Sequence, residues 1–316
     1  MKHASTEDMW SQFVPLWSDL RTVSPVMLLA GGFGLLLKQE WLISHLRYLA
    51  TEDGNVLTTE DDRPLITEES VQTVVPMDRW TRGPIRSTKD FDFLVNLDLI
   101  ASTKDQHSID EVLKKHGFGL VKGNERWEFE KILHEDQGVR LDWIAASPTE
   151  PRDDIRISDH RVKPGKSLKG IGIHAHENRE AVGAELHPFE FTHRDVTLRI
   201  PNAAVFTVMK LAAMRDSRTR ALRNQRENEG APINDEQAKK HGEDVYRALA
   251  MMTRPESEHV PAVLAAVRNG PAYADVSNIV AEYFGSELAW GSQNVGRSWQ
   301  PEDRLTMDSL LADWFQ

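Results

Sequence analysis

The period at which apolar residues recur changes near Pro201. Before that residue, several short segments alternate apolar and polar side chains, whereas after it the apolar residues recur every three to four positions. Alternation is typical of strands with one buried face, and the longer period is typical of amphipathic helices. The 316-residue chain is therefore expected to have an α+β fold, with a mixed α/β domain at residues 1–200 and a helical domain at residues 201–316.

Individual elements follow from the same periods. Two segments are expected to lack regular structure over most of their length. Residues 51–83 are acidic and weakly periodic, as in an insertion with a short hairpin near 71–75, and residues 148–169 contain the prolines and glycines of a loop. Strands are predicted at 91–97, 118–121, 127–133, 139–144 and 196–200, and helices at 9–20, 33–49, 108–116, 202–222, 236–252, 260–268, 276–287 and 305–315.

Charge and composition restrict the partners that the chain can have. A net charge of −11 disfavours non-specific binding to nucleic acid, so a nucleic-acid partner would have to meet a local basic surface. No apolar run reaches the roughly 20 residues that span a bilayer, and residues 1–8 do not have the apolar core of a signal peptide. The chain contains no cysteine. We therefore expect a cytoplasmic protein with no membrane partner and no disulfide.

A glycine turn follows the apolar run at residues 26–30. Gly31 and Gly32 would connect a short strand to the helix that begins near Phe33. Such a turn exposes backbone N–H groups at a helix N-terminus, where they can bind phosphate. A plain tight connection between a strand and a helix is equally typical of this pattern when it is taken alone.

Two aspartates with one residue between them begin the next predicted strand. Asp90 and Asp92 would point to the same face, because residues i and i+2 of a strand do so. Paired carboxylates repel unless a cation lies between them, and Mg²⁺ prefers carboxylate and phosphate oxygens. Taken alone, the pair is also typical of a solvated strand edge. Asp142 is a third acid within an apolar strand, where it either faces solvent or shares the cation.

Together these residues resemble a known family. The order Gly31-Gly32, then Arg86-Ser87-Thr88-Lys89-Asp90-Phe91-Asp92, then a third strand aspartate is similar to the DNA polymerase β-type nucleotidyltransferase superfamily. More narrowly, it resembles the AbiEii-like nucleotidyltransferases, which include toxins of bacterial toxin–antitoxin and phage-defence systems. The resemblance covers roughly residues 25 to 250.

The resemblance implies an activity and a set of site residues. The enzyme would use two Mg²⁺ ions, bound by Asp90, Asp92 and Asp142, to transfer a nucleoside monophosphate from a nucleoside triphosphate to an acceptor hydroxyl. The acceptor would be RNA, in particular the 3′ end of tRNA, or a protein side chain, and an antitoxin protein would be a partner. The nucleotide would be held by the following residues: Gly31, Gly32, Arg86, Thr88, Lys210, Arg215 and Asp244.

Two departures from the family pattern and two alternative functions accompany this interpretation. Phe33 stands where the superfamily often has serine, and about 50 residues separate Gly32 from Arg86, which is longer than usual. A small-molecule nucleotidyltransferase of the antibiotic-modifying type, and a catalytically silent nucleotide-binding protein, are the alternative functions.

The arginines that follow Lys210 (Arg215, Arg218, Arg220, Arg223 and Arg226) either bind phosphate or form a solvated helix face. A transition-metal site is a candidate at His174, His176, His187 and Asp159, although histidines are also common in polar loops. The lysines 163, 166 and 169 are expected in a solvated loop, with an RNA-binding role as the alternative.

Overall fold

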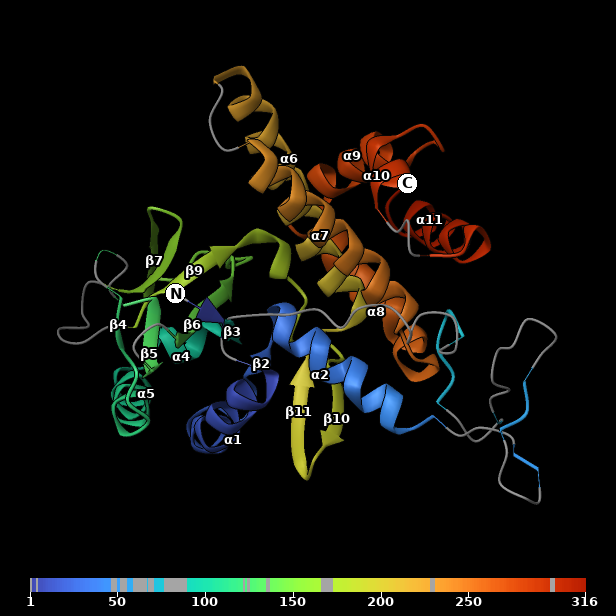
Figure 1. Cartoon of the computed structure of the whole chain (residues 1–316). Coiled ribbons are helices and arrows are strands. Elements are labelled where there is room, and N and C mark those ends of the chain that lie inside the picture. The colour runs from blue at the N-terminus through green and yellow to red at the C-terminus, as the bar shows by residue number, and fades with distance from the viewer. Residues whose placement is uncertain are drawn as a thin grey trace. The chain divides into compact units, whose positions relative to one another are not determined.

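The computed structural model of the chain describes residues 2–3, 5–46, 50–51, 56–58, 67, 71–76, 90–121, 123, 126–134, 137–165, 173–227, 231–295 and 299–316 (Figure 1). Contacts divide these residues into two compact units. The first contains the described residues within 1–36 and 86–201, and the second contains those within 37–85 and 202–316. The helix α2 (Gly31–Ser44) contributes residues to both.

The first unit is built on a mixed sheet, so the α+β class expected from the sequence is confirmed. The strand order is β2-β3-β6-β9-β8-β7 over the described residues, and β5 pairs with the first half of β6. Strands β3 and β9 run parallel to β6, whereas β2 runs antiparallel to β3. The bounds are β1 (Lys2–His3), β2 (Leu28–Leu29), β3 (Asp90–Val95), β4 (Gly119–Leu120), β5 (Glu128–His134), β6 (Gln137–Ala146), β7 (Ile155–Ser158), β8 (Arg161–Pro164), β9 (Ala175–Asn178), β10 (Phe189–His193) and β11 (Val196–Ile200).

Aromatic residues from helix and sheet form the core of this unit. Phe13 and Trp17 of α1 (Thr6–Val23) lie on one face of that helix because they are four residues apart. The Phe13 ring lies 5.5 Å from Phe91 and 5.2 Å from Phe33, and Trp17 lies 5.8 Å from Phe93, all measured between ring centroids. Phe91 and Phe93 alternate with the aspartates of β3, so burying the aromatic face turns the carboxylates to the opposite face. The remaining helices of the unit are α4 (Leu97–Ala101), α5 (Thr103–Lys115) and the 3-10 helix η1 (Arg179–Ala181).

The second unit is helical. Its long helices α6 (Ala203–Glu227) and α7 (Ala231–Ala250) pack along one another (Figure 1). Within the described residues, no helix of the chain is both long enough and apolar enough to cross a membrane. The other helices are α8 (Arg254–Asn269), α9 (Tyr273–Phe284), α10 (Trp290–Asn294) and α11 (Pro301–Phe315).

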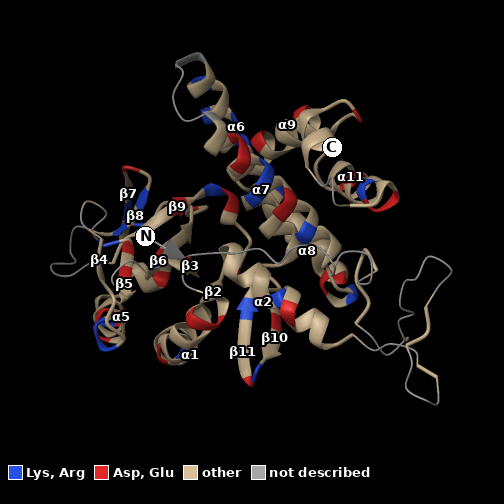
Figure 2. Cartoon of the chain, viewed as in Figure 1, with Lys and Arg blue, Asp and Glu red and all other residues tan. Residues whose placement is uncertain are grey.

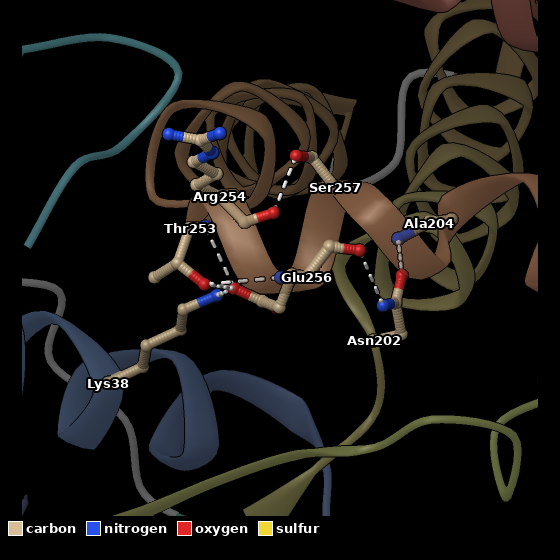
Figure 3. Close-up of polar contacts among 7 residues, drawn as sticks. All are labelled: Lys38, Asn202, Ala204, Thr253, Arg254, Glu256 and Ser257. Atoms are coloured by element: carbon tan, nitrogen blue, oxygen red, sulfur yellow. Dashed lines mark hydrogen bonds and ion pairs between the residues drawn. The ribbon is translucent and has the colours of Figure 1, made fainter.

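A buried ion pair connects the middle of α2 to the start of α8 within the second unit. Lys38 Nζ lies 2.5 Å from Glu256 Oε2, and each side chain is only 2% exposed (Figure 3). The same carboxylate caps α8, because Glu256 Oε2 accepts hydrogen bonds from the backbone N–H and the hydroxyl of Thr253. Burial lowers the pKa of Lys38, while the Glu256 carboxylate raises it. The pair therefore fixes the register between these two helices at the cost of removing both charges from water.

One predicted loop is wrong. Residues 148–169 were expected to lack regular structure, yet they contain the antiparallel hairpin β7–β8. Asp159 and His160 form its two-residue turn with φ angles of 54° and 55°. A turn that needs two left-handed residues usually contains glycine or asparagine, so this pair gave no hairpin signal. Of the predicted insertion at 51–83, only residues 51, 56–58, 67 and 71–76 are described, and Thr73 forms an isolated bridge with Thr253.

Candidate active site

The acids of β3 and β6 lie on one face of the sheet. Asp92 and Asp142 are direct partners in the parallel pairing of the two strands. Directly paired residues point to the same side, and Asp90 shares that side because it is two residues from Asp92. Asp90, Asp92 and Asp142 are all half-buried. The structure thus brings together the three aspartates that the sequence identified as metal ligands.

The glycine turn lies directly against this acidic face. Gly31 begins α2 with a φ of +64°, and a Cβ at this position would overlap the side-chain carboxylate of Asp92. Antiparallel pairing of β2 with β3, together with a 2.8 Å hydrogen bond from the Ala30 N–H to the Asp92 carbonyl, holds the turn there. Gly31 and Gly32 form the first turn of α2, where N–H groups lack partners within the helix. Backbone donors and carboxylates are therefore neighbours at this end of the helix.

A fourth acid and a cation extend the same face. Glu128 of β5 pairs with Asp142 across the antiparallel β5–β6 ladder, so a row of carboxylates runs from Asp92 through Asp142 to Glu128. Glu128 is buried, and its Oε1 lies 2.9 Å from Nη1 of Arg140, whose side chain is about half exposed. The sequence analysis did not identify either residue. The alternation in residues 127–133 placed Glu128 opposite the aromatic face, but it could not show which strand would lie beside it.

The electrostatic environment of Asp142 is unfavourable for a charge. Burial, then the Asp92, Glu128 and Asp90 carboxylates, raise the pKa of Asp142 to about 8, while Arg140 lowers it. Asp142 Oδ1 is also buried without a hydrogen-bond partner in the described part of the chain. A buried acceptor without a partner is costly. The site therefore holds an oxygen that a cation or a proton would stabilise.

These residues fit Mg²⁺ only if other ligands complete its coordination. Among the residues that the structure describes, no group of three or more acidic or histidine side chains could hold a metal ion. Mg²⁺, however, usually binds through one or two carboxylates, with waters and substrate phosphates as its other ligands. The unpartnered Asp142 oxygen and the neighbouring Asp92, whose carboxylate occupies the room that the missing side chain of Gly31 leaves, match that mode of binding.

Lys210 and Asp244 form an ion pair inside the second unit. Lys210 Nζ lies 3.1 Å from Asp244 Oδ2, and the Asp244 side chain is fully buried. The Lys210 ammonium also lies 5.4 Å from the centre of the Phe206 ring. On α6, Arg215 lies beside Asp216, and Arg218 pairs with Asp235 on α7. The two predicted nucleotide ligands on α6 and α7 are thus paired with each other.

The other predicted residues divide into two groups. Arg86 and Thr88 lie outside the described residues, as do Lys166 and Lys169. The candidate transition-metal residues do not form a metal site within the described chain, where Asp159 instead pairs with Lys163 at 2.9 Å. Lys163 is nearly buried in β8 and is not solvated in a loop. Its ammonium also donates a hydrogen bond to the Ser158 hydroxyl.

Comparisons with known proteins did not identify a relative of this chain. Searches of the chain against protein-family models, curated proteins and solved structures found no significant match.

Proposed function

We propose that the chain is a Mg²⁺-dependent nucleotidyltransferase, which moves a nucleoside monophosphate from a nucleoside triphosphate to an acceptor hydroxyl. The observation that carries the proposal is the pairing of Asp92 with Asp142 on adjacent parallel strands, beside the Gly31 turn. Carboxylates that are held together and face backbone donors suit a ligand that combines a divalent cation with phosphate. The resemblance to polymerase β-type and AbiEii-like enzymes supports the same activity.

Each residue of the acidic face has a role in the proposed reaction. Asp90, Asp92 and Asp142 would bind two Mg²⁺ ions, which when bound supply activation of the acceptor hydroxyl and neutralisation of the triphosphate. The N–H groups at Gly31 and Gly32 would orient the phosphates. The acceptor oxygen would form a bond to the α-phosphorus as the bond to pyrophosphate breaks. Asp142 would accept the hydroxyl proton once a bound cation has stabilised the ionised form of its carboxyl.

The Lys210–Asp244 pair supports a second part of the proposal. A lysine that neutralises the leaving pyrophosphate needs a fixed side chain, and the 3.1 Å contact with Asp244 holds the ammonium in place. Arg215 is a further candidate for the phosphates. The predicted roles of Arg86 and Thr88, a toxin activity and an antitoxin partner stay predictions.

The proposal is tested by nucleotide transfer. Purified protein with Mg²⁺ and each α-labelled nucleoside triphosphate is assayed with bulk tRNA, with a panel of aminoglycosides, or with neither, so that labelled RNA, small molecule or protein identifies the acceptor. Asp92→Asn is expected to lower the rate by more than about 100-fold, because even residues that only support metal ligands cost about 10- to 100-fold when replaced. Asp153→Asn, at an exposed acid before β7, is the matched control. No transfer and no Mg²⁺-dependent nucleotide binding would refute the proposal.

Lys210 requires a test that separates structure from chemistry. Lys210→Met leaves a buried carboxylate without its lysine, so a loss of activity alone is ambiguous. The double variant Lys210→Met/Asp244→Leu removes both charges, while Arg247, the other cation beside Asp244, keeps Glu243 as a partner. This variant is expected to recover stability, measured by urea unfolding, without recovering transfer. Recovery of transfer along with stability would show that Lys210 acts only through the fold.

A further inference from the structure

A group of basic side chains lies on the sheet beyond β6. Ile144 of β6 pairs with His176 of β9, and His176 pairs with Arg161 of β8. Lys163 is two residues from Arg161, and it pairs with Arg156 of β7. Paired residues lie on the same side of a sheet, and so do residues i and i+2 of one strand. Arg156, Arg161 and Lys163 therefore lie on the same face of the sheet as Ile144. Asp142, two residues before Ile144, lies on that face as well.

Arg126 belongs to the same group, which surrounds His174. The His174 N–H donates to the Arg126 carbonyl at 2.7 Å. Burial, followed by the charges of Arg126, Lys163, Arg161 and Arg156 in that order, lowers the pKa of His174 to about 4. All four cations therefore act on one imidazole, which stays neutral between them. We call these four residues the β7–β8 basic cluster.

The arginines of this cluster differ from most others in their lack of acidic partners. Arg152 pairs with Asp98 at 2.8 Å, whereas within the described chain no carboxylate lies at ion-pair distance from Arg126, Arg156 or Arg161. The Arg161 guanidinium lies 5.6 Å from the centre of the Trp127 ring. Lys163 is the exception, because Asp159 neutralises it.

Three neighbouring arginines with no carboxylate at ion-pair distance in the described chain are unexpected in a chain with a net charge of −11. Like charges repel, so such an arrangement lowers stability unless an anion binds to it. Exposed arginines suit phosphate in particular, because the guanidinium can donate two parallel hydrogen bonds. Figure 2 shows this basic character on β7 and β8.

We propose that the β7–β8 basic cluster binds the phosphate backbone of a nucleic-acid acceptor whose hydroxyl reaches the acidic face on the same sheet. The inference rests on the proposed function, for which it supplies the class of acceptor. The acidic row binds the cation and nucleotide, while the arginines hold the polyanionic strand. A cationic small-molecule acceptor would be repelled by this cluster.

The salt dependence of binding tests the cluster. The affinity of the full chain for bulk tRNA is measured over a range of salt concentrations, for wild type and for Arg156→Gln/Arg161→Gln. The logarithm of affinity falls with the logarithm of salt by about 0.7 to 0.9 for each neutralised phosphate. Removing two contacts is expected to reduce that slope by about 1.4 to 1.8 and to weaken binding by about tenfold or more.

Two further variants make the result specific. Arg254→Gln/Arg268→Gln removes the same charge from the helical unit and is expected to leave the slope unchanged. Arg220→Gln/Arg223→Gln tests the arginines of α6, the other basic segment. The proposal is overturned if the α6 variant alone lowers the slope, if the cluster variant behaves like the control, or if wild type does not bind tRNA. Matched circular dichroism spectra and unfolding midpoints verify that the variants fold.

Parallel transfer assays separate the two proposals. An active wild type whose tRNA binding does not depend on Arg156 and Arg161 refutes the cluster alone. A wild type that binds tRNA through the cluster but transfers no nucleotide refutes the proposed function and leaves the nucleic-acid site standing.

Discussion

Replacing Asp142 with asparagine is expected to stabilise the folded chain at neutral pH while it abolishes the proposed activity. Asp142 lies in a row with Asp92 and Glu128, and its Oδ1 is buried without a partner in the described chain. Burial and these carboxylates raise its pKa from 3.8 to about 8. Asparagine has nearly the same shape and no charge, so it removes the repulsion and retains the packing.

The size of the effect follows from the difference between the folded and unfolded pKa values. At pH 7 an unfolded Asp142 is ionised, whereas the folded carboxyl retains its proton. The difference of about 3 pH units between 3.8 and pH 7 is worth about 4 kcal/mol at roughly 1.36 kcal/mol per unit. We expect about 2 to 4 kcal/mol, because local relaxation and water reduce the penalty.

The direction of the pKa shift of Asp142 also determines how the stability of the chain depends on pH. A carboxyl whose pKa is raised on folding contributes most to stability below pH 3.8 and progressively less as the pH rises towards 8. The advantage of Asp142→Asn is therefore near zero at pH 4 and grows as the pH rises towards 8.

Urea unfolding followed by tryptophan fluorescence between pH 4 and pH 7.5 measures this difference. Asp153→Asn, which removes an exposed acid from the same unit, is the control and is expected to change stability by less than about 0.5 kcal/mol. Mg²⁺ with nucleotide should raise the unfolding midpoint of wild type and not of Asp142→Asn. An asparagine variant that is no more stable than wild type at pH 7, or whose advantage does not vary with pH, would refute the electrostatic argument.

Two further substitutions test the surroundings of the site and the fold. Gly31→Ala is expected to cost at least about 1 to 2 kcal/mol, because its φ of +64° is left-handed and its Cβ would overlap the Asp92 carboxylate, whereas Gly119→Ala, with open space around it, should be nearly neutral in the same urea assay. Glu256→Ala is expected to cost about 3 to 5 kcal/mol because it leaves the Lys38 ammonium buried without its carboxylate. The double variant Lys38→Met/Glu256→Leu should recover most of that loss, and simple additivity of the two single effects would contradict the ion-pair explanation.

Local patterns were sufficient to predict most elements but not the turns that join them. The strand that carries Asp90 and Asp92 and the strand that carries Asp142 were predicted because buried aromatic and aliphatic residues alternate with polar ones. The β7–β8 hairpin was missed because Asp159 and His160 adopt left-handed conformations, which the ion pair between Asp159 and Lys163 within the hairpin supports. Propensity alone does not contain that information.

The neighbours of the site could not be predicted because they depend on strand order and register. Alternation placed Asp142 on the polar face of its strand, but only pairing with β3 and β5 sets Asp92 on one side and Glu128 on the other. The same pairing, continued through β9 to β8, sets Arg161 on the face of these acids.

The distribution of charge on this face is itself an argument for ligands. A row of carboxylates lies around a half-buried Asp142, and beyond it lie arginines with no carboxylate at ion-pair distance in the described chain. Like charges repel, so each group lowers the stability of a protein that binds nothing there. A fold under selection for stability alone would pair the two groups with each other, as it pairs Lys38 with Glu256. The separation of the carboxylates from the arginines on one sheet is explained if a cation binds the carboxylates and a phosphate backbone binds the arginines. The nucleotide would then lie between the two groups.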